Sequence, residues 1–343
     1  MTSPLAVTIE TAPAEWMRYV LDHEDATGYH EWPWRDVFKS AFGHESIYLA
    51  ARAHGAIVGV LPLVLIDSWL FGRALVSVPF LNYGGVVADD SAAAAALLER
   101  ATAIGRERRC RHIELRHTTQ HFSALPCKQH KVAMRLGLEP PAAMWEGLDR
   151  KVRNQVRKAQ KSGLTYHAGA RDLLDEFYVV FARNMRDLGT PVYGRSFFER
   201  VLEAFPTRAR IHVVRQGDAP IAAGFTFQTR QMQEIPWASS IREFNSLCGN
   251  QLLYWSILES AAASGCATFD FGRSTPNEGT YRFKEQWGAR PLPLVWEYQL
   301  LKDSALPNSS PTNPKYSVAI SAWKKLPLAV TNRLGPAIVR SIP

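Results

Sequence analysis

HGAIVGVLPL (residues 54–63) and GDAPIAAGFTF (residues 217–227) are the two stretches that decide the fold. Each carries a glycine turn that leads into an apolar run, and each follows another apolar run, at 46–52 in the first case and 210–215 in the second. Short apolar runs separated by a glycine turn are typical of β-hairpins. The sequence therefore predicts the same hairpin in both halves of the chain.

The segments around the two hairpins repeat as well. In the first half they predict a helix at 13–22, a third strand at 74–79, a helix at 91–108 and a strand at 112–115. In the second half they predict helices at 172–188 and 196–204, a third strand at 233–239, a helix at 251–264, a strand at 267–271 and a final strand pair around 292–300. Both halves thus follow the order helix, three strands, helix, strand.

This repetition indicates two copies of one α/β (α+β) unit, each a mixed, mostly antiparallel sheet flanked by helices. A tandem duplication is a simpler explanation than a single sheet built from all these strands. We therefore expect a first domain at 1–145, a second domain at 146–302 that is led by a basic helix, and a basic, proline-containing tail at 303–343.

The composition is that of a globular protein, with 46% hydrophobic and 21% charged residues among 343. The chain starts without a basic n-region, and its longest apolar run, 56–66, has about half the length that crosses a bilayer. The four cysteines form no CxxC pair, which favours a reducing compartment: Cys110, Cys127, Cys248 and Cys266. We expect a cytoplasmic protein that could also rest on the inner face of the membrane.

The net charge of +8 comes from two local patches. Residues 150–161 hold six cations and no acid, and residues 304–343 hold five cations and no acid. Without these eleven charges the remainder of the chain carries −3, since 8 − 11 = −3. Such patches indicate anionic partners.

The stretch FDFGRSTPNEGTYRFKEQWG (residues 269–288) gathers polar and aromatic side chains behind a short strand. Loops at the ends of strands often carry function, because a rigid scaffold positions them. The candidate site residues in this stretch are Asp270, Arg273, Ser274, Thr280, Tyr281, Lys284 and Trp287.

This stretch resembles the C-terminal signature of the FemAB-like family of the GNAT acyltransferases. Three further pieces resemble it too: KVRNQVRKAQKSGL (151–164), PIAAGFTF (220–227) and NQLLYWSILESAAASG (250–265). More narrowly, the pieces resemble the branch linked to PEP-CTERM and exopolysaccharide loci, while the first half of the chain matches only in pattern. The resemblance implies transfer of an acyl or aminoacyl group to an amine. In peptidoglycan-bridge members the donor is aminoacyl-tRNA and the acceptor is a cell-wall precursor.

The start of the helix at 251–264 is a candidate anion site. Helix N-termini present unpaired N–H groups and the positive end of the dipole, which can hold a phosphate. Gly249 allows close backbone approach, Asn250 is a candidate N-cap, and Gln251 follows it. The Gln/Arg-x-x-Gly-x-Gly/Ala loop of coenzyme-A-binding families is missing here, which argues against acetyl-CoA. An ordinary capped core helix explains the pattern equally well.

The basic stretch at 150–161 is expected to be amphipathic, with Val152, Val156 and Ala159 on its inner side. Four residues of the polar side are predicted to bind an anionic substrate such as a nucleotide-sugar, a lipid pyrophosphate or a tRNA: Arg153, Asn154, Arg157 and Lys158. The alternative is a solvated helix that keeps the protein soluble.

Lys284 is the first catalytic candidate, because acyl transfer develops negative charge on a carbonyl oxygen that a cation can stabilise. Asp270 either pairs with Arg273 or Lys284 or accepts a proton from the attacking amine. Tyr281, the third catalytic candidate, is expected to wall the acceptor site together with Trp287. The alternative is a structural Asp–Arg pair under aromatic core residues.

No GxSxG, HExxH, GxGxxG or GxxxxGK[ST] motif occurs, so no metal, dinucleotide, ATP or tightly bound cofactor is expected. The leading hypothesis is an acyltransferase for a cell-envelope, peptidoglycan or exopolysaccharide acceptor, with aminoacyl-tRNA or acyl-CoA as donor. The alternatives are a CoA-dependent N-acetyltransferase and a non-catalytic, polyanion-binding scaffold.

The tail has its own candidate role. Trp323 precedes Lys324 and Lys325, a combination that suits a membrane interface. Equally, the tail could pack back on the fold or fray.

Overall fold

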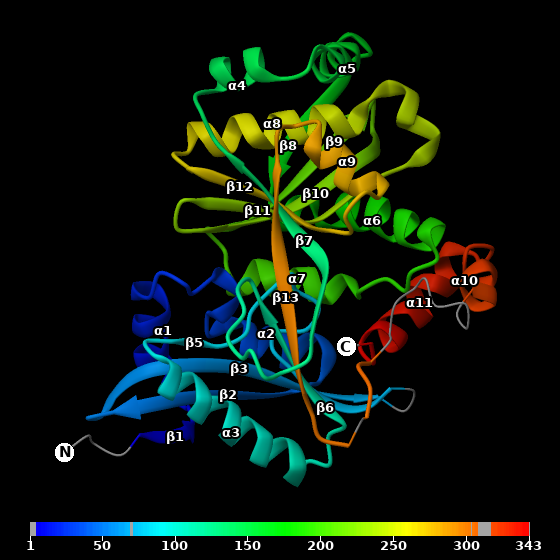
Figure 1. The fold of residues 1–343 in the computed structure, drawn as a ribbon. Coiled ribbons are helices and arrows are strands. Elements are labelled where there is room, and N and C mark those ends of the chain that lie inside the picture. Colours follow the sequence, from blue (N-terminus) through cyan, green and yellow to red (C-terminus); the bar gives the residue numbers. More distant parts are fainter. Residues whose placement is uncertain (1–4, 69–70, 303, 308–316, 343) are drawn as a thin grey trace. The chain divides into compact units, whose positions relative to one another are not determined.

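The computed structural model describes residues 5–68, 71–302, 304–307 and 317–342. The chain divides into two compact units (Figure 1). Unit 1 comprises Met1–His130, Pro293–Asn313 and Arg340–Pro343, and unit 2 comprises Lys131–Leu292 and Pro314–Val339. The helices of the predicted tail, as far as Val339, therefore cluster with unit 2.

Unit 1 is a sheet with helices on both faces. Its elements are β1 (Ala6–Ile9), α1 (Pro13–Asp22), η1 (Gly28–His30), α2 (Pro33–Phe42), β2 (Glu45–Ala53), β3 (Ala56–Ser68), β4 (Gly72–Val76), β5 (Val87–Ala88), α3 (Ser91–Glu107), β6 (His112–His117) and the later part of β13 (Arg290–Leu300). The strand order is β1-β2-β3-β4-β6-β13, and β5 pairs with β3. Only β4 and β6 run parallel among these pairs.

Strand alternation separates two hydrophobic clusters in unit 1. Leu49 of β2 packs in a cluster with Leu97 of α3, whereas its neighbour Tyr48 packs with Trp16 of α1. Helices α1 and α3 therefore cover opposite faces of this sheet.

Unit 2 repeats the arrangement. Its elements are β7 (Cys127–Gly137, from Lys131), α4 (Pro141–Gly147), α5 (Arg150–Lys161), β8 (Leu164–Gly169), η2 (Arg171–Leu173), α6 (Leu174–Leu188), α7 (Arg195–Ala204), β9 (Ala209–Gln216), β10 (Ala219–Thr229), β11 (Met232–Ser240), η3 (Arg242–Leu247), α8 (Gly249–Ala263), β12 (Thr268–Ser274), α9 (Gly279–Glu285), α10 (Ser317–Trp323) and α11 (Leu328–Val339). The strand order is β7-β12-β11-β10-β9-β8, with β11 and β12 parallel and the other pairs antiparallel.

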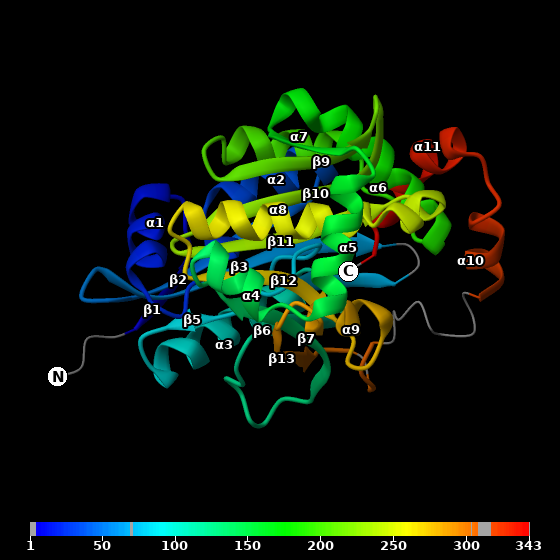
Figure 2. The ribbon, with the colours of Figure 1, turned by 90° about the horizontal axis from the view of Figure 1, so that it is seen from above.

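The strand arrangement within each unit confirms the predicted fold class and its tandem repeat. In each unit an antiparallel three-strand meander is followed by a helix and a parallel strand, with a further antiparallel strand beyond it. The helices that precede the parallel strands are α3 and α8, and Figure 2 shows α8 and α5 on the same side of the unit 2 sheet.

The predicted helices agree with the structure to within two residues at either end. Two predictions were wrong in detail: the final pair of strands is the single strand β13, and the strand expected at 74–79 ends at Val76. Two elements were not predicted at all, helix α9 and strand β7. The burial of β7 is confined to its middle, so the two-residue alternation that marks a strand is weak there.

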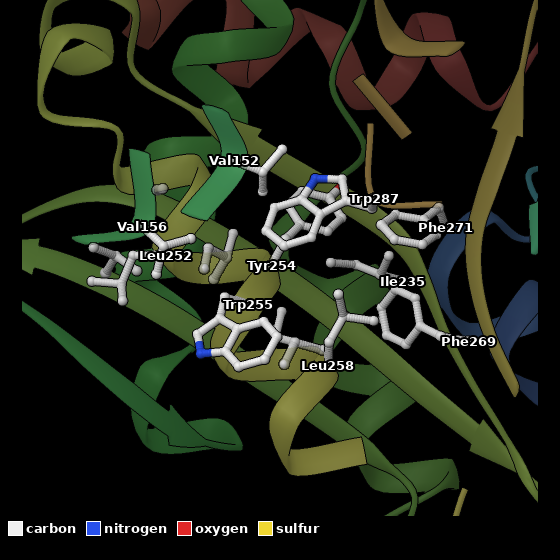
Figure 3. Close-up of a cluster of buried hydrophobic side chains, with 14 of the residues drawn as sticks. Val152, Val156, Ile235, Leu252, Tyr254, Trp255, Leu258, Phe269, Phe271 and Trp287 are labelled. Atoms are coloured by element: carbon white, nitrogen blue, oxygen red, sulfur yellow. The ribbon is translucent and has the colours of Figure 1, made fainter. Parts of the chain in front are cut away.

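One hydrophobic cluster of unit 2 lies between α8 and the strands of the unit (Figure 3). Val152 and Val156 of α5 point toward α8, which confirms the predicted inner side of the basic helix. In the part of the chain that the structure describes, every helix is too short or too polar to cross a bilayer.

Candidate active site

Strand β12 ends in a bulge that is built around Asp270. The Asp270 side chain is fully buried; its Oδ2 accepts a hydrogen bond from Arg135 Nε at 2.9 Å, and its Oδ1 accepts one from Gly272 N at 2.7 Å. The pairing register with β7 shifts between Asp270 and Arg273, and Gly272 has a φ of +75°. Since such a φ favours glycine, the FDFGRS sequence fits this bulge.

Lys284 is anchored on that bulge. Its side chain is only 7% exposed, and its Nζ donates to the carbonyl oxygens of Gly272 at 3.0 Å and Arg273 at 3.1 Å. An ammonium has three N–H donors, so one remains for another acceptor. Burial lowers the pKa of Lys284 to about 8; the Asp270 carboxylate opposes this effect, and the charge of Arg273 adds to it. The ammonium is therefore mostly protonated at neutral pH.

Helix α9 holds Lys284 beside the first half of α8. The ring of Phe283, the neighbour of Lys284, packs edge-on against Tyr254 of α8 with a centroid distance of 5.0 Å. Figure 3 shows Trp287 lying against Tyr254, with Phe271 of β12 nearby. Trp287 was expected to form a wall of the acceptor site. Its side chain is only 3% exposed, so it lies in the hydrophobic core.

The N-terminus of α8 differs in detail from the expectation. The helix begins at Gly249; Cys248, with a φ of +61°, occupies the N-cap position, and Asn250 lies inside the first turn. No described side chain caps this end. A Cβ on Gly249 would lie 2.9 Å from Ile221 of β10, so this glycine allows the helix to approach the sheet. Gln251 follows in the first turn and is half-buried.

The remaining predicted residues of the turn lie at different depths. Ser274 is buried, and its hydroxyl has no hydrogen-bond partner among the described residues. Arg273 and Tyr281 are half-buried, and Tyr281 packs against the core of unit 2. Thr280 is exposed.

Two cationic residues at this site were missed by the sequence analysis. Arg135 binds Asp270, for which Arg273 or Lys284 had been expected as partner. Lys131 Nζ donates to Thr275 Oγ1 at 2.6 Å, and burial together with the charge of Arg273 lowers the Lys131 pKa. Both belong to β7, and only strand pairing brings β7 against β12.

The basic helix α5 borders a surface cavity of about 500 Å³. Two of the four predicted anion-binding residues, Asn154 and Lys158, line it together with Asp149, Arg150, Lys151 and Gln155. Arg157 instead lies over the ring of Trp145 at 5.4 Å, and Arg153 is half-buried with an enclosed Nε. The cavity is therefore mainly cationic, with one carboxylate at its edge.

Residues 148–285 match the family model described as an acetyltransferase (GNAT) domain. The match contains α5, α8, β12 and α9, so this part of unit 2 is similar to a GNAT domain, and Lys284 lies within the matched residues. No curated protein matches the chain by sequence.

Solved structures are similar over most of the chain. The crystal structure of FemX has 15% identity and a TM-score of 0.68, covering 92% of this chain and 100% of that chain. The C-terminal domain (DUF2156) of a putative lysylphosphatidylglycerol synthetase from Agrobacterium fabrum has 10% identity and a TM-score of 0.58, covering 90% and 94%. A tandem GNAT protein from the clavulanic acid biosynthesis pathway has 11% identity and a TM-score of 0.58, covering 88% and 100%. These likenesses show a tandem GNAT fold.

Proposed function

We propose that this GNAT-fold protein is an acyltransferase that moves an acyl or aminoacyl group to the amine of a cell-envelope acceptor. The acceptor class, a peptidoglycan precursor or an exopolysaccharide-related amine, follows from the FemAB-like signature around Lys284, and the narrower resemblance to the PEP-CTERM branch favours the latter. The fold shared with FemX is consistent with this reading.

A single observation carries the proposal: a buried lysine, held by two backbone carbonyls, keeps one N–H donor for a further acceptor. A fixed cation in a poorly solvated site stabilises a developing oxyanion more strongly than water does, without rearranging during the reaction. Mutagenesis of comparable donors in other enzymes costs roughly 100- to 1,000-fold in kcat.

In the proposed reaction the acceptor amine attacks the carbonyl carbon of the donor. The new C–N bond forms, the carbonyl oxygen becomes an oxyanion that accepts a hydrogen bond from Lys284, and the C–O bond of an aminoacyl ester or the C–S bond of a thioester breaks. The leaving oxygen or sulfur takes the proton that the amine loses. Lys284 remains protonated, and Asp270 positions the bulge that holds it.

The donor is proposed to be anionic. The uncapped first turn of α8 and the cationic cavity of α5, both in unit 2, offer contacts for phosphate groups. An aminoacyl-tRNA would fit both features, since its backbone carries a series of phosphates.

Acetyl-CoA is the second candidate donor, and the match of residues 148–285 to an acetyltransferase domain favours it. Isothermal titrations with acetyl-CoA and with aminoacyl-tRNA separate the two candidate donors. Micromolar binding of acetyl-CoA supports acetyl-CoA as the donor, whereas binding of aminoacyl-tRNA alone supports aminoacyl-tRNA. Lys158→Ala, which removes a cation that lines the α5 cavity, is then expected to weaken binding of the anionic donor.

The decisive test follows transfer by mass spectrometry with aminoacyl-tRNA or acetyl-CoA and a panel of amine acceptors. Lys284→Met is expected to reduce kcat by at least 100-fold while the protein stays folded, with a melting temperature no lower than that of the wild type. The matched control is Lys39→Met, which removes an exposed lysine of unit 1. Full turnover by the Lys284 variant contradicts the role proposed for Lys284. A wild type that binds the anionic donor but transfers nothing to any acceptor contradicts the proposed activity and favours a polyanion-binding scaffold.

A further inference from the structure

We propose that α10 and α11 dock unit 2 on the surface of an anionic lipid bilayer. This inference is independent of the transfer reaction, because it rests on a helical hairpin whose residues take no part in the site around Lys284.

The hairpin is fixed to unit 2 through its inner side. A Cβ added at Gly189, directly after α6, would meet Ile320 at 2.5 Å and Lys324 at 3.0 Å, and one added at Gly335 would meet the backbone of Val192 at 2.9 Å. Arg186 also donates to the carbonyl oxygen of Leu326 at 3.2 Å. Figure 1 shows α10 and α11 in red beside α6. The hairpin is therefore a packed part of the unit with a defined outer side.

The outer side of α11 is apolar. Thr331, Gly335 and Val339 are the buried residues of the helix, and they recur at four-residue spacing. The residue before each of them is exposed, namely Val330, Leu334 and Ile338. The side chain of Leu334 is 46% exposed. Four-residue spacing places these three side chains in a second stripe along the helix, beside the buried one.

Exposed apolar side chains are concentrated on this hairpin. Val318 of α10 is 79% exposed. Together with the stripe of α11 it accounts for four of the eight large hydrophobic side chains that are exposed among the described residues. The three side chains of the α11 stripe are grouped, and grouped apolar exposure marks an interaction surface, whereas single exposed apolar residues need no explanation.

The charge of this segment selects the partner. Lys324, Lys325 and Arg333 are exposed, although the stem of Lys324 lies against Gly189, and residues 304–343 contain no acid. Asp187, at the end of α6, is already paired with Arg186 at 2.6 Å. Apolar side chains that insert beneath the headgroups, flanked by cations that meet anionic headgroups, are the combination that holds a helix in a membrane interface.

Trp323, which the sequence offered as a candidate for the membrane interface, is not assigned the anchoring role in this proposal. It is half-buried, and its indole Nε1 is enclosed by protein. The three side chains of α11 and Val318 take that role in the proposal.

The test is sedimentation of the full-length protein with vesicles of phosphatidylcholine, with and without phosphatidylglycerol. We expect binding to the anionic vesicles that weakens as salt is raised. Replacing Lys324, Lys325 and Arg333 together by Gln should lower the partition coefficient on the order of 100-fold, because each charge near the surface contributes about 1 kcal/mol, or about fivefold. Replacing Val330, Leu334 and Ile338 together by Ser should lower it at least tenfold.

Leu21→Ser and Lys39→Gln are the matched controls, since they change an exposed apolar residue and an exposed cation of unit 1. Both are expected to bind like the wild type, and all variants should keep the wild-type melting temperature. Two outcomes overturn the proposal: unchanged vesicle binding by both triple variants, or a dimer in sedimentation velocity that the Ser variant abolishes. The second outcome would assign the stripe to another copy of the chain.

Discussion

Lys284 is held in a place where burial and hydrogen bonding act against each other. Its ammonium gains two carbonyl acceptors and loses most of its hydration, and the balance lowers its pKa to about 8. Strongly shifted groups of this kind concentrate at functional sites, because a merely structural lysine is usually solvated.

The first prediction concerns the pH dependence of transfer. If protonated Lys284 stabilises the oxyanion, kcat should fall about tenfold per pH unit above about pH 8. Below that pH the acceptor amine becomes protonated, so the complete profile is expected to be bell-shaped. The measurement is kcat from about pH 6 to about pH 10. A rate that rises through pH 8 and then stays level would instead make Lys284 a general base.

The second prediction concerns stability. The folded-state pKa of Lys284 lies below the unfolded value, so between the two the unfolded chain binds the extra proton and stability rises with pH. The cost of the buried charge is fully present below about pH 8 and is relieved as pH rises toward about 10, by roughly 3 kcal/mol. Urea unfolding of the wild type should show this rise. Lys284→Met should lack it, and an identical slope in both proteins would contradict the assignment.

At this scale the sequence singled out Lys284, which the structure places against the turn, but not the cations that lie next to it. Lys284 could be singled out because a cation follows a strand that ends in a polar turn. Arg135 and Lys131 could not, since they are distant in sequence and meet β12 only through the pairing of β7. Trp287 was misjudged, because an aromatic residue next to candidate site residues can equally well face the core.

Among the elements, the bulge in β12 is the one that creates the site. Gly272 adopts its positive φ in the bulge, so the carbonyls of residues 272 and 273 face the Lys284 ammonium. Gly272 and the buried Asp270 thus set the conformation of the bulge and the position of the two carbonyls that hold Lys284.

The third prediction tests this element. Gly272→Ala should destabilise the protein by about 1–2 kcal/mol, because a left-handed φ is unfavourable for a residue with a Cβ. It should also lower kcat as the carbonyls shift away from Lys284. The matched control is Gly217→Ala, which has a φ of +57° in an open turn where a Cβ meets nothing within 4 Å. Gly217→Ala is expected to lose a comparable amount of stability and to keep a normal kcat. Equal kcat values for the two variants would contradict the role of the bulge in positioning Lys284.

Long apolar elements were predictable, and short polar ones were not. Helix α8 and strand β10 consist of long apolar runs that are buried over most of their length. Helix α9 spans only seven residues, of which Lys284 alone is buried, so the sequence shows no apolar periodicity that would predict this helix. Its formation depends on Phe283 and Trp287 packing against Tyr254.

For the whole molecule, the sequence shows the two repeats but does not show that β13 and β7 each pair within the other repeat. β13 follows unit 2 in the chain, yet its residues 295–300 pair with β6 of unit 1. Residues 132–137 of β7 follow the first repeat and pair with β12 of unit 2. Pattern similarity identifies equivalent elements, but it cannot tell which copy of a strand joins which sheet.

The last prediction follows from this exchange. Glu297 of β13 is fully buried in unit 1, where its carboxylate lies 2.7 Å from His117 Nδ1 and accepts hydrogen bonds from the amides of His121 and Phe122. Burial would raise the pKa of Glu297, but these hydrogen bonds outweigh it and lower the pKa. A fragment of residues 1–130 lacks this carboxylate and leaves the edge of β6 unpaired.

That fragment is therefore expected to show no cooperative urea transition by tryptophan fluorescence. Joining residues 293–302 to it through a flexible linker should restore a single transition, because the strand then returns Glu297 and the backbone partners of β6. The same linked fragment with residues 293–302 in scrambled order is the control and should remain unfolded. Cooperative unfolding of residues 1–130 alone would show that unit 1 does not depend on the strand that follows unit 2.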